Sequence, residues 1–225
     1  MNTRIDSTRA VFSRLSGVPM SGLRALLMAA LAGMSLSGCS MIYKTTGDVM
    51  QGFSKDHTVP YLLQSNDLAM ACAMSEAVQP LLLSFGRVTT PPDQLAVMMS
   101  LQAGGCAEDR AREAELEGIA ALRARAPEAA EDAIIRQKRY YALAAQRYFS
   151  GWKHEIEYYG NPKSGECPDF DEDLEEFIYL GGLLSGLQAL NAEIQSTAPI
   201  GVPKNIGSVV ARATSCLDNS KWWGG

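Results

Sequence analysis

Apolar residues recur every three or four positions through nearly all of residues 66–217, and this spacing constrains the fold more than any other feature of the chain. Apolar side chains at that interval line one face of an α-helix, whereas a half-buried β-strand needs strict alternation of apolar and polar residues. No stretch of this body shows such alternation or a hairpin turn signal. The sequence therefore predicts an all-α protein, a helical bundle of successive antiparallel helix pairs.

The first helix is expected to follow Ser65-Asn66-Asp67, because these side chains are typical helix caps. Its sequence is apolar on much of the circumference, so we expect it to be buried, with a kink at Pro80. The turn Thr89-Thr90-Pro91-Pro92 ends it and opens the next helix.

The second half of the hairpin begins at Asp93, and we expect Gly104-Gly105 to interrupt it. Small residues at helical spacing follow, which allow two helices to approach closely; they are Ala107, Ala111, Ala114, Gly118 and Ala121. Pro127 breaks this helix, and a long aromatic-rich helix runs on to Gly160, with Gly151 as a point where it divides. A later apolar helix carries Gly181, Gly182, Ser185 and Gly186 at close-packing positions, and a last amphipathic helix covers 204–217.

The N-terminal region is typical of an export signal. Four arginines and one aspartate precede an apolar core at residues 26–34, which is too short for a permanent membrane span. The sequence LSGCS, residues 36–40, then matches a bacterial lipoprotein box, in which the Cys39 thiol is acylated and the preceding peptide bond is cut. An ordinary signal peptide, in which Cys39 has no special role, is the alternative. Because Ser40 stands where an aspartate favours retention at the inner membrane, we expect the periplasmic face of the outer membrane.

Cleavage before Cys39 would leave 225 − 38 = 187 residues and change the net charge from −5 to −5 − 3 = −8, because four arginines and one aspartate are removed. An acidic body without basic clusters does not fit a nucleic-acid-binding protein. We expect residues 1–38 to be the signal peptide and residues 39–65 to be a lipidated tether and entry segment with one short helix near 48–53. Residues 66–225 are then one helical domain.

Four body cysteines remain in a compartment where disulfides persist. If the first two helices fold back about Thr89, Cys72 lies 89 − 72 = 17 residues before the turn and Cys106 lies 106 − 89 = 17 residues after it. Both then sit about 25 Å along the hairpin, on opposite helices. This register predicts a Cys72–Cys106 disulfide and, by exclusion, Cys167–Cys216.

No catalytic site, cofactor or metal site is predicted, and the chain is expected not to be an enzyme. The two histidines, His57 and His154, lack the neighbouring ligands or nucleophiles that zinc sites and triads need. Three alternating aspartates at 169, 171 and 173 imitate the start of a calcium loop, but Leu174 and Leu180 occupy the places of its glycine and bidentate glutamate. The cysteines also lack the close pairs of zinc modules.

The stretch from Arg136 to Phe149 interleaves arginines and aromatic residues on one helix. Such a helix can line a cleft, where a guanidinium pairs with a carboxylate and rings cover apolar parts of a solute. The candidate ligand-binding residues are Arg139, Tyr140, Tyr141 and Trp152. The alternative is that the rings belong to the core and that the arginines are solvated or paired with Glu131, Asp132 or Glu155.

Four features together resemble the periplasmic T-component lipoproteins associated with TRAP transporters. They are the lipobox, the helix start Ser65-Asn66-Asp67-Leu68, the segment Arg139-Tyr140-Tyr141-Ala142-Leu143 and the late helix 180–186. The resemblance implies a tetratricopeptide-repeat-like (TPR-like) α-solenoid or bundle around a cavity, and a homotrimer. It further implies that the protein acts together with a TRAP solute-binding protein and a membrane carrier in the uptake of a small-molecule solute. This chain departs from the pattern by lacking a strict 34-residue repeat and by adding the four body cysteines.

The functional expectation is therefore a non-enzymatic lipoprotein that binds or relays a small, anionic or amphipathic solute. The rival is an envelope scaffold or assembly lipoprotein that grips another protein through its helical surface. An unrecognised hydrolase is a third, weaker reading.

Overall fold

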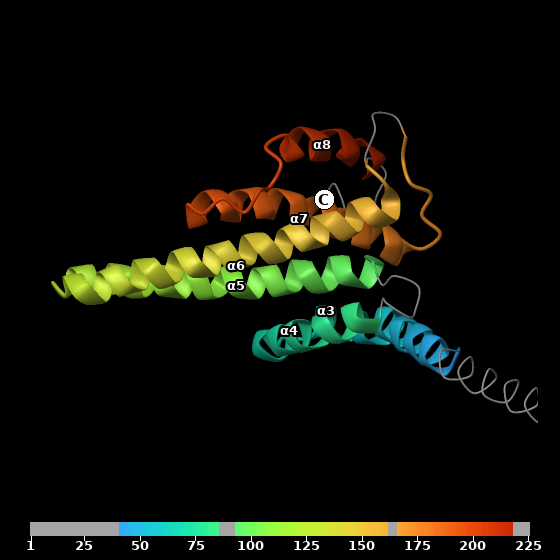
Figure 1. The fold of residues 1–225 in the computed structure, drawn as a ribbon, viewed down its shortest axis with the longest axis horizontal. Helices are drawn as coiled ribbons and strands as arrows, with labels where there is room; N and C mark the ends of the chain where they lie inside the picture. The colour runs from blue at the N-terminus through green and yellow to red at the C-terminus, as the bar shows by residue number, and fades with distance from the viewer. Residues whose placement is uncertain (1–40, 86–92, 162–165, 218–225) are drawn as a thin grey trace, which may run out of the picture. The chain divides into compact units, whose positions relative to one another are not determined.

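The computed structural model describes residues 41–85, 93–161 and 166–217. Within these ranges the regular elements are all helical, which confirms the predicted all-α helical bundle (Figure 1). The predicted signal segment, Cys39 and the turn at residues 89–92 lie outside the described residues. The chain divides into two compact units, Met1–Thr46 and Gly47–Gly225, and the elements from η1 onward belong to the second. Among the described residues, no helix combines the length and apolar character needed to cross a bilayer.

The entry segment is more regular than the sequence suggested. Residues 41–53 are helical, a five-residue π-helical turn η1 (Ser54–Thr58) follows, and α3 (Val59–Gln64) completes the run. Val59 and Leu62 of α3 are buried in one apolar cluster with Ala71, Leu95 and Met99. The end of the expected tether therefore packs against α4 and α5.

Helix α4 (Leu68–Phe85) begins where the capping residues predict. The N–H of Met70 donates to Oδ1 of Asp67 at 2.9 Å, which satisfies one of the unpaired amides at the helix start. One side of α4 faces α5 (Asp93–Arg123), but Leu68 and Leu81 are exposed, so the expectation of a buried helix was wrong.

The long hairpin of α5 and α6 (Pro127–Tyr159) is the centre of the fold, and its two helices share the largest interface (Figure 1). Small residues allow the close approach, as predicted: a Cβ added to Gly118 would lie 3.4 Å from Cβ of Ala133. The expected interruption at Gly104-Gly105 is absent, and α5 runs through both glycines. Gly104 lies directly against the ring of Tyr148, so its missing side chain makes room for the neighbouring helix.

Helix α7 (Asp173–Ser196) packs along α6 through its own small residues. A Cβ on Gly151 would lie 3.0 Å from Ser185 Oγ and 3.2 Å from Ser100 Cβ, so α5, α6 and α7 converge there. Gly151 therefore does not divide α6, contrary to the expectation. On α7, Gly186 lies against the ring of Trp152, which confirms the close-packing role predicted for it.

Helix α8 (Ile206–Ala213) and the short 3₁₀ turn η2 (Thr214–Leu217) cover α7 on the side away from α5 (Figure 1). Ile206 and Val210 bury their side chains in the main core. Two disulfides link the outer elements to the rest: Cys72 joins α4 to Cys106 of α5, and Cys167, ahead of α7, joins Cys216 of η2. The Cα–Cα separations are 5.7 and 5.3 Å; the first pair is the one that the hairpin register predicts, and the second is the one that remains by exclusion.

Candidate functional site

The structure separates the four candidate residues of the aromatic helix. Arg139 is exposed and Tyr140 is half-buried, whereas Tyr141 and Trp152 are buried in the main core. None of the four lines any of the three cavities described below. Tyr141 and Trp152 therefore follow the alternative interpretation, in which the rings are core residues.

A different pair of arginines converges on one carboxylate where α4, α5 and α6 meet. Arg110 of α5 binds Glu76 of α4 in a bidentate manner, with Nη1–Oε1 at 2.9 Å and Nη2–Oε2 at 3.1 Å. Nη1 of Arg147 on α6 donates to the same Oε1 at 2.6 Å and to the carbonyl oxygen of Ala103 at 2.9 Å. We call these three charged side chains the Glu76 cluster.

The electrostatics of the cluster follow from this geometry. The hydrogen bond from Arg110 is the main cause that holds the pKa of Glu76 below its ordinary value, and Arg147 acts in the same direction against partial desolvation. Glu76 is therefore ionised at neutral pH, and two guanidinium groups and one carboxylate leave the cluster with a charge of +1. Ion pairs of this kind are geometrically specific, because a guanidinium presents a planar fork of donors.

A hollow beside the cluster lies between α4 and α6, and we call it the α4–α6 groove. Its volume is about 390 Å³. The polar lining groups beside Glu76 are Gln79, Gln146, Arg147 and Ser150, and the apolar lining comes from Pro80, Leu83 and Leu143. The groove therefore combines polar side chains and the Arg147–Glu76 ion pair with an apolar wall, which suits a small amphipathic solute.

A second cavity lies on the other side of Glu76, between α4 and α5, with a volume of about 490 Å³. Leu68, Ala69, Ala73 and the Cys72–Cys106 disulfide give it an apolar wall. Asp109 and Glu113 line it together with Glu76 and Arg110, so acidic groups outnumber basic ones there. An anion fits the α4–α6 groove better than this acidic cavity.

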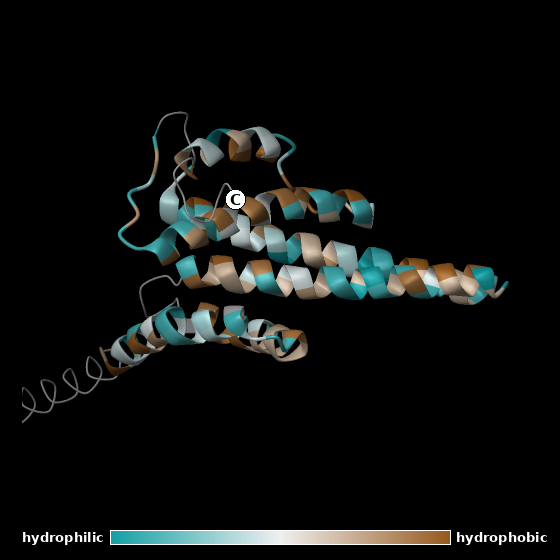
Figure 2. Cartoon of the chain, turned by 180° about the vertical axis from the view of Figure 1, so that it is seen from behind, coloured by the Kyte–Doolittle hydropathy of each residue, from teal (hydrophilic) through white to brown (hydrophobic). Residues whose placement is uncertain are grey.

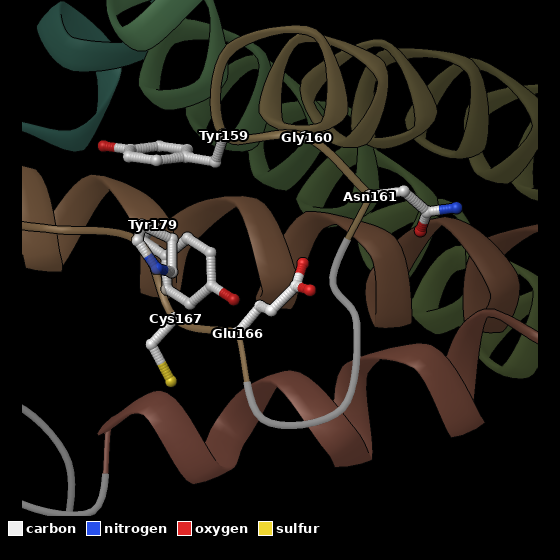
Figure 3. Close-up of a pocket in the computed structure, with 7 residues that line it drawn as sticks. Tyr159, Gly160, Asn161, Glu166, Cys167 and Tyr179 are labelled. Carbon is white, nitrogen blue, oxygen red and sulfur yellow. The ribbon is translucent and has the colours of Figure 1, made fainter.

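A third cavity, of about 280 Å³, opens near the Cys167–Cys216 disulfide, and Figure 3 shows it. The Glu166 carboxylate and the Tyr179 hydroxyl lie on the same side of this space, and Tyr159 and Asn161 border it. Burial raises the pKa of Tyr179 to about 12, so its phenol stays protonated. Its described lining residues include no cationic side chain, so it offers an anion no charged partner.

Glu155 of α6 is the most unusual ionisable group in the described residues. Its side chain is fully buried, and neither carboxyl oxygen has a hydrogen-bond partner in the protein. Desolvation raises its pKa to about 9, so the group is a neutral acid at pH 7. It lies against Gly182 of α7, where any side chain would collide with it.

The described residues contain no group of three or more histidine, cysteine or acidic side chains placed to hold a metal ion. His154 is half-buried, with Nδ1 at 2.8 Å from Oδ1 of Asp93 at the start of α5. This contact ties α6 to α5.

The Glu76 cluster was not predicted from the sequence, because its members are far apart along the chain. Arg110 lies 34 residues after Glu76, and Arg147 lies 71 residues after it. The Cys72–Cys106 register gives only a partial signal. Glu76 and Arg110 each follow a bonded cysteine by one helical turn, but in an antiparallel pair these steps run in opposite directions, so the two residues lie about 12 Å apart along the axis and only their long side chains meet.

Comparison of the chain with protein-family models, with curated proteins and with solved structures finds no match.

Proposed function

We propose that this chain is an exported, lipid-anchored, non-enzymatic helical protein that binds a small amphipathic carboxylate in the α4–α6 groove during solute uptake. The observation that carries the proposal is the convergence of Arg110 and Arg147 on Glu76 beside a groove with one apolar wall.

Arg147 is the residue proposed to contact the solute. Its guanidinium carries five N–H donors, and both contacts described above run through Nη1. Gln146 and Ser150 line the same groove, and Leu83 and Leu143 face an apolar tail there. The solute class that follows is a carboxylate attached to a short hydrocarbon body.

The proposed cellular role follows the resemblance to the T-component lipoproteins. The chain is proposed to be anchored through Cys39 to the periplasmic face of the outer membrane. It would pass solute to a TRAP solute-binding protein and carrier, as a homotrimer like the family.

Isothermal titration calorimetry with octanoate tests the groove, with octanol as the uncharged probe of the same length. Octanoate is expected to bind saturably and more tightly than octanol. Arg147→Ala is expected to weaken octanoate binding about 10- to 100-fold, because one charge-assisted hydrogen bond contributes about 1.5–3 kcal/mol. Arg136→Ala is the matched control, since Arg136 is an exposed arginine of the same helix that pairs with Glu117.

Two results would contradict the groove as the binding site. If Arg147→Ala lowers the melting temperature but leaves the octanoate affinity unchanged, Arg147 is only structural. If Arg139→Ala abolishes binding and Arg147→Ala does not, the solute lies on the exposed face of α6 instead.

The scaffold alternative has one observation in its favour. The free end of the α5–α6 hairpin extends past α4 and α7 (Figures 1 and 2), and Leu116, Ile119 and Leu122 are exposed there. Exposed apolar side chains grouped at one end of a molecule mark protein-binding surfaces. Crosslinking in intact cells separates the two functions: a protein partner lost in Leu116→Asp supports a scaffold, whereas a copurified small molecule lost in Arg147→Ala supports solute binding.

A further inference from the structure

Residues 41–53 form one uninterrupted helix with an exposed apolar stripe. Ile42, Val49, Met50 and Phe53 stand at positions i, i+7, i+8 and i+11, which share one face of a helix, with Thr46 at i+4 between them. Their exposed fractions are 66%, 66%, 41% and 60%. Tyr43, 60% exposed, borders the same face.

The opposite face of this helix is polar. Helical spacing places Lys44 and Asp48 there, and these two residues cancel in charge. The stripe is therefore apolar without an accompanying basic face. A surface that binds this stripe must therefore offer hydrocarbon rather than anionic groups.

The position of the stripe identifies that surface. Ile42 lies 42 − 39 = 3 residues after Cys39, the residue that the proposed function places in the membrane through its acyl chains. The stripe extends 53 − 42 = 11 residues, or about 17 Å, from there. An acyl anchor at one end holds such a helix at the bilayer surface, where an amphipathic helix buries its apolar face about 5–10 Å into the boundary between headgroups and acyl chains.

We propose that residues 41–53 lie in the membrane interface, with Ile42, Val49, Met50 and Phe53 inserted among the lipids beside the Cys39 anchor. The inference rests on the proposed lipid anchor and deepens it, because the segment becomes a second membrane contact instead of a flexible tether. The Phe53 ring is also 5.1 Å from the His57 ring, which marks the end of the inserted stripe.

Depth-dependent fluorescence quenching tests the insertion. The acylated protein carrying Phe53→Trp is reconstituted into phosphatidylcholine vesicles whose acyl chains are brominated. Leu116→Trp is the matched control, since Leu116 is an equally exposed apolar residue on the distant hairpin end. The native tryptophans are common to both variants, so the difference between them reports the added ring.

Bromine is expected to quench the fluorescence added by Phe53→Trp at least about threefold more than that added by Leu116→Trp, because only the first ring lies among acyl chains. Adding Val49→Asp to Phe53→Trp should abolish the excess, while Lys44→Asp, on the opposite polar face, should preserve it. Phosphatidylglycerol in the vesicles should leave the excess unchanged, since the stripe has no basic face.

Two negative results are distinguishable. If the protein floats with the vesicles and both added tryptophans are quenched equally weakly, the anchor stands and the inserted helix is refuted. If the intact mass of the purified protein shows no acyl chains at Cys39, the anchor itself fails and the inference fails with it.

Discussion

Replacing Glu155 with glutamine tests whether the buried carboxyl between α6 and α7 is carried as a neutral acid. The pKa of this group is raised from 4.5 to about 9 in the folded protein, with desolvation as the cause. At pH 7 the unfolded chain is ionised at this position, whereas the folded chain must hold the proton. The difference of 7 − 4.5 = 2.5 pH units costs about 3 kcal/mol of stability, at about 1.4 kcal/mol for each unit.

The direction of the pH dependence follows from proton binding. Between about pH 4.5 and pH 9 the folded state binds one more proton at Glu155 than the unfolded state does, so the free energy of unfolding falls as pH rises. Glutamine has the same shape and cannot ionise. Glu155→Gln should therefore be about 3 kcal/mol more stable at pH 7, nearly equal to the wild type at pH 4.5, and free of this part of the pH slope.

Urea unfolding followed by circular dichroism, with the disulfides intact and at several pH values from 5 to 8, measures the effect. Thermal unfolding should show the same gain: at pH 7 the melting temperature of Glu155→Gln should be about 6–12 °C above that of the wild type, since 1 kcal/mol corresponds to about 2–4 °C in a chain of this size. Glu157→Gln is the control, because Glu157 is exposed on the same helix. A Glu155→Gln protein that keeps the wild-type pH slope, or is less stable at pH 7, would contradict the account of Glu155 as a buried neutral acid.

Two further predictions follow from packing and from the crosslinks. Gly104→Ala should destabilise the protein by about 1–3 kcal/mol in chemical denaturation, because the added Cβ would overlap the ring of Tyr148. The neighbouring Gly105→Ala makes only an ordinary contact with Tyr148 Oη and should stabilise α5 by about 0.5–1 kcal/mol. Equal effects of the two substitutions would contradict the close approach at Gly104. Replacing Cys72 and Cys106 together by serine should cost about 4 kcal/mol in urea unfolding, because the disulfide closes a loop with a sequence separation of 34, and an unchanged midpoint would mean that the bond does not form in solution.

The all-α class and the pattern of helix contacts were predictable because they depend on local spacing. The small residues Ala111 and Gly118 of α5 and Gly186 of α7 stand at intervals that fix which helix faces pack closely. The disulfide partners were predictable for a similar reason, since counting residues along a hairpin gives the register.

The errors arose where tertiary contacts decide the outcome. Glycine lowers helix propensity, which suggested breaks at Gly104 and Gly151, but both positions are needed for the approach of a neighbouring helix. The apolar circumference of α4 suggested burial, yet Leu68 and Leu81 are exposed. The candidate site was harder still, because Arg147 meets Glu76 only after three helices have packed.

The two disulfides tie the peripheral elements of the bundle to its centre. The contact of α4 with α5 and the contacts of α8 and η2 with α7 are small, while the extensive interfaces are those of α6 with α5 and with α7. Reducing agents should therefore loosen the periphery first, so that α4 and α8 gain amide hydrogen exchange while the central three helices stay protected. Such a molecule unfolds in stages: the α4 wall of the proposed groove depends on the Cys72–Cys106 disulfide, and the central helices do not.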